Sequence, residues 1–303
     1  MKDKNSTIKK NIVLAFQNHK KNNFKVAESI YKKILKLNPN HFDSIFLLGS
    51  LLLQTKNYDK AIQLLNKAIQ IKPDYADAYH NLGLAFLELG EFKKAMDYSK
   101  KAIQTQHSHV EAYNNLGNVF KELREFSKAK NCYLQAIQIQ PNHAKAHNNL
   151  GNIMKELGEF EKAIDSYQKA IQIQPNYASA HNNLGMVFRE LGEFEKAISS
   201  YQMAIKIQSN YVAAHHNLGM IFQKMREHQK AISCFQKTIQ IKPDHAVTYY
   251  SLGMAYVELG KFEKAISAYQ MAVKYEPENL AYFYYLIDLK KDILDSNLKN
   301  KIY

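Results

Sequence analysis

The sequence predicts an all-α fold, a solenoid of tandem helix-turn-helix repeats. Three observations predict it, and each is a residue type that recurs at one constant interval, the interval from Gly49 to Gly83. Seven glycines follow one another at this interval, namely Gly49, Gly83, Gly117, Gly151, Gly185, Gly219 and Gly253. The six prolines are separated by the same interval or by twice its length, namely Pro39, Pro73, Pro141, Pro175, Pro243 and Pro277. An unbroken alanine series runs Ala27, Ala61, Ala95, Ala129, Ala163, Ala197, Ala231 and Ala265. A fixed period of this length is the signature of stacked structural repeats.

The composition supports a folded chain and bounds its partners. Hydrophobic residues make up 46% of the sequence, with 20 Tyr and 15 Phe, which is ample for a continuous core. The net charge of +13 is concentrated in residues 1–41, where ten lysines face only Asp3 and Glu28. Residues 42–279 lack the clustered basic stripe that phosphate neutralisation requires. The charge distribution therefore argues against a nucleic-acid partner.

Residues 144–177 give the clearest copy of the repeat. Its first half has a stripe at i, i+3, i+4 and i+7, and its second half another, which predicts two amphipathic helices. Their positions are His147, Leu150, Gly151 and Met154, then Phe160, Ala163, Ile164, Tyr167, Ala170 and Ile171. Gly158 lies between the stripes as a C-terminal cap, and Pro175 ends the second helix. Each repeat is therefore expected to be an antiparallel hairpin, in which the small Gly and Ala let two helices approach closely.

These residues resemble a known family. Asn-Asn-Leu-Gly, then Ala about twelve residues on, an aromatic residue four later and Pro after eight more, is similar to the tetratricopeptide repeat. The resemblance implies a right-handed α-α superhelix with seven tandem repeats, at 42–75, 76–109, 110–143, 144–177, 178–211, 212–245 and 246–279. We expect residues 1–7 to be a tail, 8–41 a degenerate capping repeat with Ala15 for Gly and Asn18 for the aromatic, and 280–303 a capping helix. Tyr282, Phe283, Leu286 and Leu289 are expected to cover the last repeat.

The resemblance also implies that the first helix of each repeat lines a concave groove, and these helices are rich in asparagine. The candidate asparagines are Asn81, Asn114, Asn115, Asn118, Asn148, Asn149, Asn152, Asn182, Asn183 and Asn217. Asparagine is a poor helix former, so ten of them cost on the order of 5 kcal/mol. The ladder resembles that of the repeat arm of O-linked N-acetylglucosamine transferases, which hold extended peptides. Either the carboxamides bind a peptide backbone, or they only bond adjacent repeats together.

Other first-helix positions extend this candidate peptide- or partner-binding site. The C-terminal end is apolar where the middle is polar, through Met220, Tyr250 and Met254, which are typical of an adaptable binding surface or of packing under the capping helix. Lys121, Lys155 and Arg189 recur with the period of the repeat and either contact carboxylates or phosphates of a ligand or are screened by the adjacent Glu122, Glu156 and Glu190.

No residue pattern indicates catalysis, a cofactor or a metal. His147, His181 and His215 occupy a place that Tyr fills in other repeats, which indicates packing, and no Cys or carboxylate stands at ligand spacing. No nucleophile has a positioned base. We therefore predict that the chain is not an enzyme and has no cofactor.

The predicted function is a non-catalytic scaffold or adaptor that binds an extended peptide or a partner protein in the groove. The alternative is a substrate-selecting repeat arm of a glycosyltransferase-like system whose catalytic part lies elsewhere. Cys132 and Cys234 fall three repeats apart, too far for a disulfide, and no apolar stretch approaches the roughly 18 residues that a membrane span needs. We expect a cytoplasmic location.

Overall fold

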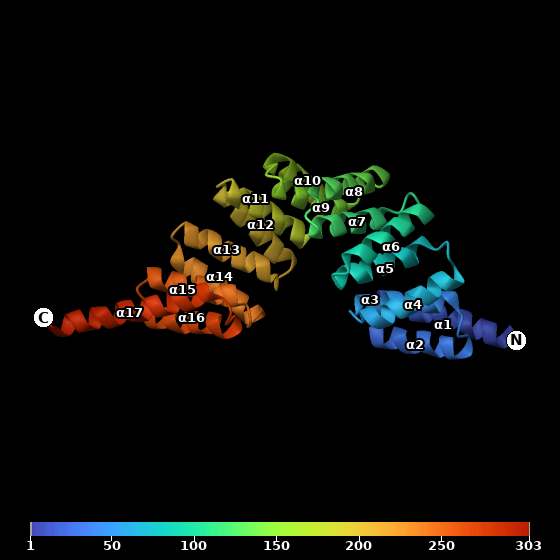
Figure 1. The fold of residues 1–303 in the computed structure, drawn as a ribbon, viewed down its shortest axis with the longest axis horizontal. Coiled ribbons are helices and arrows are strands. Elements are labelled where there is room, and N and C mark those ends of the chain that lie inside the picture. Colours follow the sequence, from blue (N-terminus) through green and yellow to red (C-terminus); the bar gives the residue numbers. More distant parts are fainter. Residues whose placement is uncertain (1, 303) are drawn as a thin grey trace. The chain divides into compact units, whose positions relative to one another are not determined.

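The computed structural model describes the backbone of residues 2–302 and the side chains of residues 7–291. The described chain consists of helices joined by short turns and contains no strand (Figure 1). The helices are α1 (Lys2–Lys20), α2 (Phe24–Leu37), α3 (Phe42–Gln54), α4 (Tyr58–Ile71), α5 (Ala76–Glu88), α6 (Phe92–Thr105), α7 (Val110–Glu122), α8 (Phe126–Ile139), α9 (Ala144–Glu156), α10 (Phe160–Ile173), α11 (Ala178–Glu190), α12 (Phe194–Ile207), α13 (Val212–Lys224), α14 (His228–Ile241), α15 (Ala246–Glu258), α16 (Phe262–Tyr275) and α17 (Leu280–Ile302). The predicted all-α helical-repeat class is confirmed.

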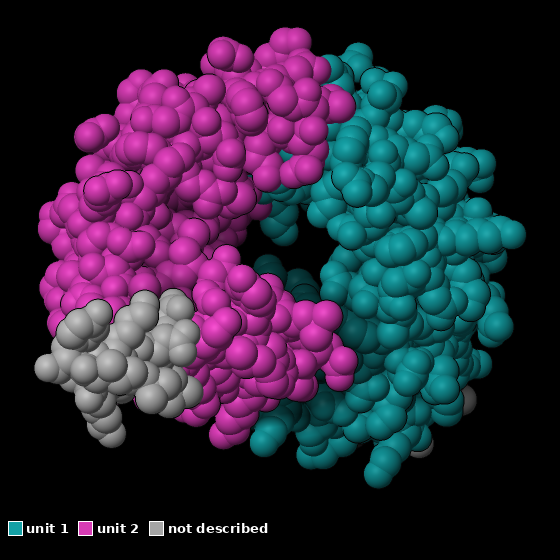
Figure 2. Space-filling model, turned by 60° about the vertical axis from the view of Figure 1, so that its left-hand side comes forward, with its two compact units in different colours: residues 1–153 teal, residues 154–303 magenta. Residues whose placement is uncertain are grey.

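The chain forms two compact units, residues 1–153 and 154–303, which Figure 2 colours teal and magenta. In unit 1, α1 pairs with α2, α3 with α4, α5 with α6 and α7 with α8, and the second helix of one hairpin contacts the first helix of the next. Unit 2 repeats this arrangement from α11 with α12 to α15 with α16, and α17 packs on α16. The assignment of these hairpins to seven complete repeats and a degenerate one stays a prediction.

Each hairpin turns through one residue with a positive φ. Four of these residues are glycines with φ between 66° and 76°, namely Gly90, Gly158, Gly192 and Gly260. Four others have φ near 60° without being glycine, namely Asn22, Lys56, Arg124 and Arg226. The backbone N–H of the following residue bonds back into the first helix, as from Glu193 to the carbonyl of Phe188 at 2.8 Å. The turn therefore depends on its backbone hydrogen bonds, and glycine only lowers its conformational cost.

The periodic glycines of the first helices face a side chain of the second helix in the same hairpin. A Cβ atom on Gly117 would lie 2.5 Å from Cε1 of Tyr133, and one on Gly219 would lie 2.5 Å from Cε1 of Phe235. Both rings are fully buried. Glycine is required here because the ring occupies the space that any other side chain would need.

The two ends of the chain differ in part from expectation. Helix α1 begins at Lys2, inside the segment expected to be a tail, since no Gly or Pro interrupts residues 2–7; the side chains of residues 1–6 lie outside the described residues. In α17, Tyr282, Leu286 and Leu289 are buried as expected. The expectation for Phe283 was wrong: this side chain is 40% exposed, because it lies off the i, i+4, i+7 stripe of the other three.

No helix within the described part of the chain is both long enough and apolar enough to cross a membrane.

The contact between glycine and ring predicts a position-dependent effect of Gly→Ala substitutions. In Gly219→Ala the new methyl group would overlap the Phe235 ring, so we expect a net loss of about 1–2 kcal/mol in the free energy of unfolding despite the better helix propensity of Ala. Gly49→Ala is the matched control, because its nearest neighbour is Cγ of Leu65 at 3.1 Å. Urea denaturation measures both. Adding Phe235→Leu should recover part of the loss, and equal stability of the two alanine variants would contradict the proposed constraint.

Candidate functional site

The predicted asparagines all lie on first helices, from α5 to α13, but they differ in exposure. Four are buried, with 4–8% of their surface exposed, namely Asn114, Asn115, Asn148 and Asn182. Six are half-buried, namely Asn81, Asn118, Asn149, Asn152, Asn183 and Asn217. We call the surface that these residues form within each unit the ladder face of that unit, with Asn81, Asn118, Asn149 and Asn152 in unit 1 and Asn183 and Asn217 in unit 2. Only the half-buried residues present a polar edge to solvent.

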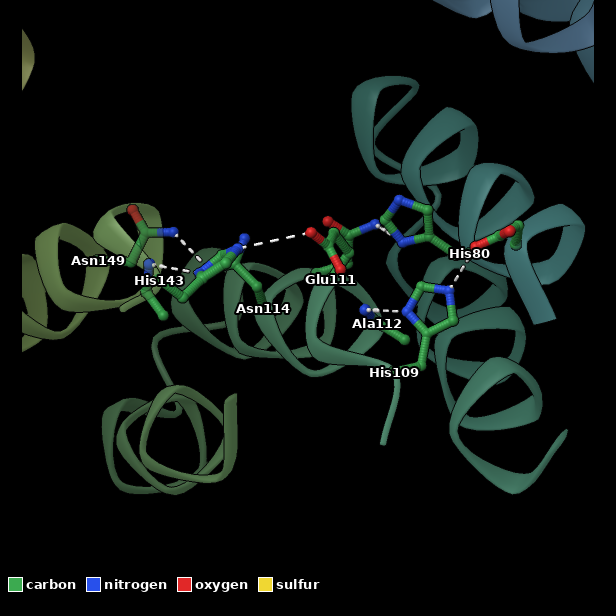
Figure 3. Close-up of polar contacts among 10 residues, drawn as sticks. His80, His109, Glu111, Ala112, Asn114, His143 and Asn149 are labelled. Carbon is green, nitrogen blue, oxygen red and sulfur yellow. Dashed lines mark hydrogen bonds and ion pairs between the residues drawn. The ribbon is translucent and has the colours of Figure 1, made fainter. Parts of the chain in front are cut away.

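In unit 1 the asparagine two residues before each periodic glycine donates a hydrogen bond to the preceding hairpin. The donor–acceptor distances are 2.9 Å from Asn81 to Ser50 Oγ, 3.1 Å from Asn115 to His80 Nδ1, and 2.9 and 3.2 Å from Asn149 to Asn114 Oδ1 and Asn118 Oδ1. Figure 3 shows Asn149 pointing toward Asn114, and a dashed bond reaching His80. These bonds link neighbouring first helices and fix the orientation of each carboxamide.

Unit 2 contains the same contact two periods further on. Asn217 donates to Oδ1 of Asn182 at 3.0 Å, and Asn182 is itself buried. The Nδ2 atom of Asn182 lies 3.4 Å from Oδ1 of the half-buried Asn183. In both units, therefore, a buried asparagine, Asn114 or Asn182, accepts a hydrogen bond from the half-buried asparagine of the next hairpin.

Directly after the periodic glycine, asparagine in unit 1 gives way to methionine in unit 2, and this difference reaches the hairpin core. The hydroxyl of Tyr133, whose ring packs on Gly117, donates to Oδ1 of Asn118 at 2.7 Å. Tyr201 occupies the corresponding place in unit 2, but Met186 stands where the acceptor would be, and the Tyr201 hydroxyl is buried with no hydrogen-bond partner. Burial raises the pKa of Tyr201 to about 12. Sequence spacing could have revealed this coupling, since the interval from ladder position to tyrosine is the same in both hairpins.

The apolar end of the predicted site is partly on the surface. Met220 is 36% exposed, and Ser251 Oγ lies 3.5 Å from its sulfur. Met254 and Tyr250 are half-buried. The centroid of the Tyr250 ring lies 5.2 Å from that of Tyr282 on α17. Tyr250 therefore packs under the last helix, which favours the packing alternative for this residue.

The three periodic cations pair with the glutamate next to each of them. The nitrogen–oxygen distances are 2.9 Å for Lys121 with Glu122, 3.0 Å for Lys155 with Glu156 and 2.7 Å for Arg189 with Glu190. These six charges therefore form a mixed face, and the pairing favours the alternative in which the cations are screened.

A second set of polar contacts in unit 1 did not emerge from the sequence (Figure 3). His109 precedes α7, accepts a hydrogen bond from the backbone N–H of Ala112 at 3.2 Å, and donates through Nε2 to Asp77 at 3.0 Å. His143 repeats this before α9, with Nε2 3.6 Å from Glu111. Each histidine thus caps its own helix and contacts a carboxylate in the first turn of the preceding first helix. The separation of the two pairs by one period of the repeat was the available signal.

These contacts shift several pKa values. The polar contact with His143, partly opposed by burial, lowers the pKa of Glu111 to about 2, and the hydrogen bond from His109 lowers the pKa of Asp77. Burial, together with the nearby His109 ring, lowers the pKa of His80 to about 4. At neutral pH the two carboxylates are therefore charged and His80 is neutral.

The three periodic histidines bond a backbone carbonyl six residues earlier, at the end of the preceding repeat. Nε2 lies 2.9 Å from the carbonyl of Pro141 for His147, 3.0 Å from that of Pro175 for His181, and 2.9 Å from that of Ser209 for His215. These contacts close the turn before each first helix. Within residues 7–291, no group of three or more His, Cys, Asp or Glu side chains is arranged to hold a metal ion.

The fold and these contacts define a helical-repeat protein of the kind that serves as an interaction scaffold. Family models described as TPR repeat match residues 49–90, 151–188 and 185–225. Others described as tetratricopeptide repeat match residues 211–275, 110–143, 30–63, 132–165 and 76–106. Together they cover most of the chain, which therefore belongs to the tetratricopeptide-repeat family. None of the curated proteins compared with the chain matches it.

Solved structures with the same fold share little sequence identity with this chain. A chain of the crystal structure of the APC/C hetero-tetramer Cut9-Hcn1 has a TM-score of 0.72 and 18% sequence identity, over 91% of this chain and 54% of that one. Pseudomonas aeruginosa PilF has a TM-score of 0.62 and 22% identity, over 70% of this chain and 97% of that one. This chain thus spans about half of the Cut9-Hcn1 chain, and at these identities the likeness shows the fold alone.

The coupling of tyrosine and asparagine predicts opposite effects in the two units. Tyr133→Phe removes a buried hydrogen bond and should lower the free energy of unfolding by about 1 kcal/mol. Tyr201→Phe removes an unpaired buried hydroxyl and should be neutral or stabilising. Urea denaturation checks both, and Met186→Asn should make Tyr201→Phe destabilising. Equal losses for the two Phe variants in the parent chain would contradict this assignment.

The low pKa of His80 predicts an acid-sensitive contribution to stability. Its pKa is about 4 in the folded chain and about 6.5 when unfolded, so protonation favours unfolding as the pH falls from 6.5 toward 4. Between pH 7.5 and 5, this group should lower the free energy of unfolding by roughly 1–2 kcal/mol. His80→Asn is a matched change, because Asn114 and Asn148 occupy this place in the next two repeats. Urea midpoints at the two pH values should show a smaller loss in the variant, and an equal loss would refute the prediction.

Proposed function

We propose that the chain is a non-catalytic scaffold that holds an extended peptide, or an extended segment of a partner protein, on the ladder face. The observation that carries the proposal is the exposure of a row of carboxamides that neighbouring hairpins already hold in place. Asn81 and Asn149 show this in unit 1, and Asn217 shows it in unit 2. The repeat fold itself is typical of non-catalytic scaffolds.

The contacts between hairpins leave polar atoms available to a ligand. A carboxamide has two N–H donors and a carbonyl acceptor. Among the described residues, Asn81 and Asn217 each use one donor contact, to Ser50 and Asn182 respectively. The second N–H and the carbonyl can pair with the C=O and N–H of a peptide backbone. The two alternatives for the ladder are therefore compatible, because the structural bond orients the group that would bind.

This arrangement supports recognition of the backbone more than of a particular sequence. Neighbouring helices pack about 8–10 Å apart and an extended chain advances about 3.3–3.6 Å per residue, so consecutive hairpins meet roughly every third peptide residue. Because the carboxamides are already ordered, binding does not have to immobilise them, which reduces its entropic cost. We expect broad specificity with modest affinity.

The ladder also supports a second candidate, a substrate-selecting arm of a glycosyltransferase-like system, because both functions use backbone contacts to an extended peptide. Broad and weak binding of unstructured acceptor peptides would favour this arm. Recovery of one stoichiometric folded partner in a pull-down would favour the adaptor and argue against the arm.

The test is binding of a random-sequence peptide library to the parent chain and to a variant with Asn149, Asn183 and Asn217 all changed to Ala. These residues are half-buried. The control changes Asn131, Asn142 and Asn176 to Ala, three exposed asparagines outside the ladder face. We expect the ladder variant to lose at least about tenfold in affinity and the control to bind like the parent.

Circular dichroism separates binding from folding. Each substitution removes a hydrogen bond worth about 0.5–1.5 kcal/mol and gains about 0.5 kcal/mol of helix propensity, so the melting temperature should shift only slightly. If the ladder variant binds like the parent, or if neither binds while the variant melts much lower, the asparagines are structural and the proposal fails.

A further inference from the structure

A pocket in unit 1, outside the predicted site, is lined by the second half of α1 and the first turns of α3. Its volume is about 330 Å³, and α1, α3 and the residue preceding α5 line it. The lining residues are Ile12, Val13, Phe16, Asp43, Phe46, Leu47 and Tyr75. Ile12 and Phe46 precede their periodic positions by three residues, and Val13 and Leu47 by two, which are the places that asparagines fill further along. The pocket therefore continues the helix positions of the ladder, with apolar side chains in place of amides.

Three aromatic rings and one carboxylate give the pocket its chemistry. Phe46 and Tyr75 are in edge contact, with ring centroids 4.9 Å apart, and Phe16 supplies the third ring from α1. Asp43 is exposed, and no basic nitrogen in the described part of the chain lies within ion-pairing distance of it. An apolar occupant would displace water from this carboxylate without replacing its hydrogen bonds, which is unfavourable. The pocket therefore suits a side chain that is apolar along its length and cationic at its end.

We propose that this pocket binds an arginine or lysine side chain of a basic, extended protein segment. The inference rests on the proposed function, since the rest of the segment would follow the ladder face. The methylene stem would lie against Ile12, Val13 and Leu47, and the charged end would meet Asp43 and the rings of Phe46 and Tyr75. Arginine fits best, because its planar group stacks on aromatic rings and pairs with a carboxylate through two hydrogen bonds.

The carboxylate of Asp43 recurs at the same helix position in the next two hairpins, as Asp77 and Glu111. The side chains of both are more than half exposed, and both remain charged at neutral pH, because polar contacts with His109 and His143 lower their pKa values. Lys9 precedes this row by one period and Lys145 follows it by one. The row of negative charge therefore spans three hairpins, and with about three peptide residues per hairpin the favoured ligand has a cation at every third residue.

The test uses fluorescein-labelled peptides of sequence GRSGRSGRSG, the same sequence with citrulline for Arg, the same with Leu for Arg, and one of equal composition with Arg at every second residue. Fluorescence anisotropy measures their affinities for the full chain. The net charge of +13 opposes any cationic peptide at long range, so a preference for Arg over its neutral isostere must come from a local site. We expect the Arg peptide spaced by three to bind at least tenfold more tightly than the others.

Matched variants locate the binding. Asp43→Asn should weaken the Arg peptide about tenfold, and its control is Asp59→Asn, an exposed aspartate in the first turn of α4. Val13→Ser should weaken it severalfold, and its control is Val26→Ser, because the two valines are 55% and 49% exposed. Equal effects of Asp43→Asn and Asp59→Asn, or equal binding of the Arg and citrulline peptides, would overturn the proposal. Preferred binding of the Leu peptide would make the site an apolar anchor and also reject the cation.

The triple ladder variant distinguishes this inference from the proposed function. If Asp43→Asn weakens the Arg peptide and the ladder variant does not, the pocket stands and the ladder proposal fails. If only the ladder variant binds the Arg peptide more weakly, the ladder proposal stands and the pocket proposal fails. If the full chain binds none of the four peptides, the pocket proposal is rejected, and the random-sequence library alone decides the proposed function.

Discussion

The close approach of a bare backbone to a buried ring is the constraint on which the rest of this structure depends. Gly117 and Gly219 lie where a single methyl group would overlap Tyr133 and Phe235. The first helix can therefore pack on its partner in only one rotational setting, since any other would bring a side chain into the ring. That setting decides which residues of the first helix face solvent and which face the neighbouring hairpins. The polar surface is thus a consequence of the hairpin core.

The ring that defines the core also reaches the surface. Tyr133 packs on Gly117 and donates its hydroxyl to Asn118, which in turn accepts from Asn149 of the next hairpin. One chain of contacts therefore connects the interior of a hairpin, its half-buried carboxamide and the adjacent repeat. In unit 2, Met186 interrupts this chain beside Tyr201. The core tyrosine thus orients the asparagine side chain through a hydrogen bond in unit 1, and the methionine in unit 2 lacks such a bond.

Unit 1 carries further polar contacts, and histidine is central to them. His109 and His143 cap helices and hold the carboxylates of Asp77 and Glu111 in their charged form, while His80 accepts from the buried Asn115. A neutral His80 ring is compatible with the burial of this side chain. A protonated ring would have no nitrogen left to accept the hydrogen bond from Asn115. The first-helix surface of unit 1 therefore combines amides that are held in place with fixed negative charge.

The sequence by itself determined the fold, because its constant period records the same steric demand in every repeat. Gly117 and its counterparts can be read from spacing alone, and so can the helix on which each asparagine lies. Only the tertiary structure decided whether the amide two residues before the glycine is buried, since Asn115 and Asn149 have the same place in their repeats but only Asn115 is buried. It also assembled the pocket around Asp43, whose lining comes from residues as far apart as Ile12 and Tyr75. Periodicity reveals residues that repeat the same contact from one hairpin to the next, whereas this pocket joins unlike side chains of three hairpins, and no period records such a meeting.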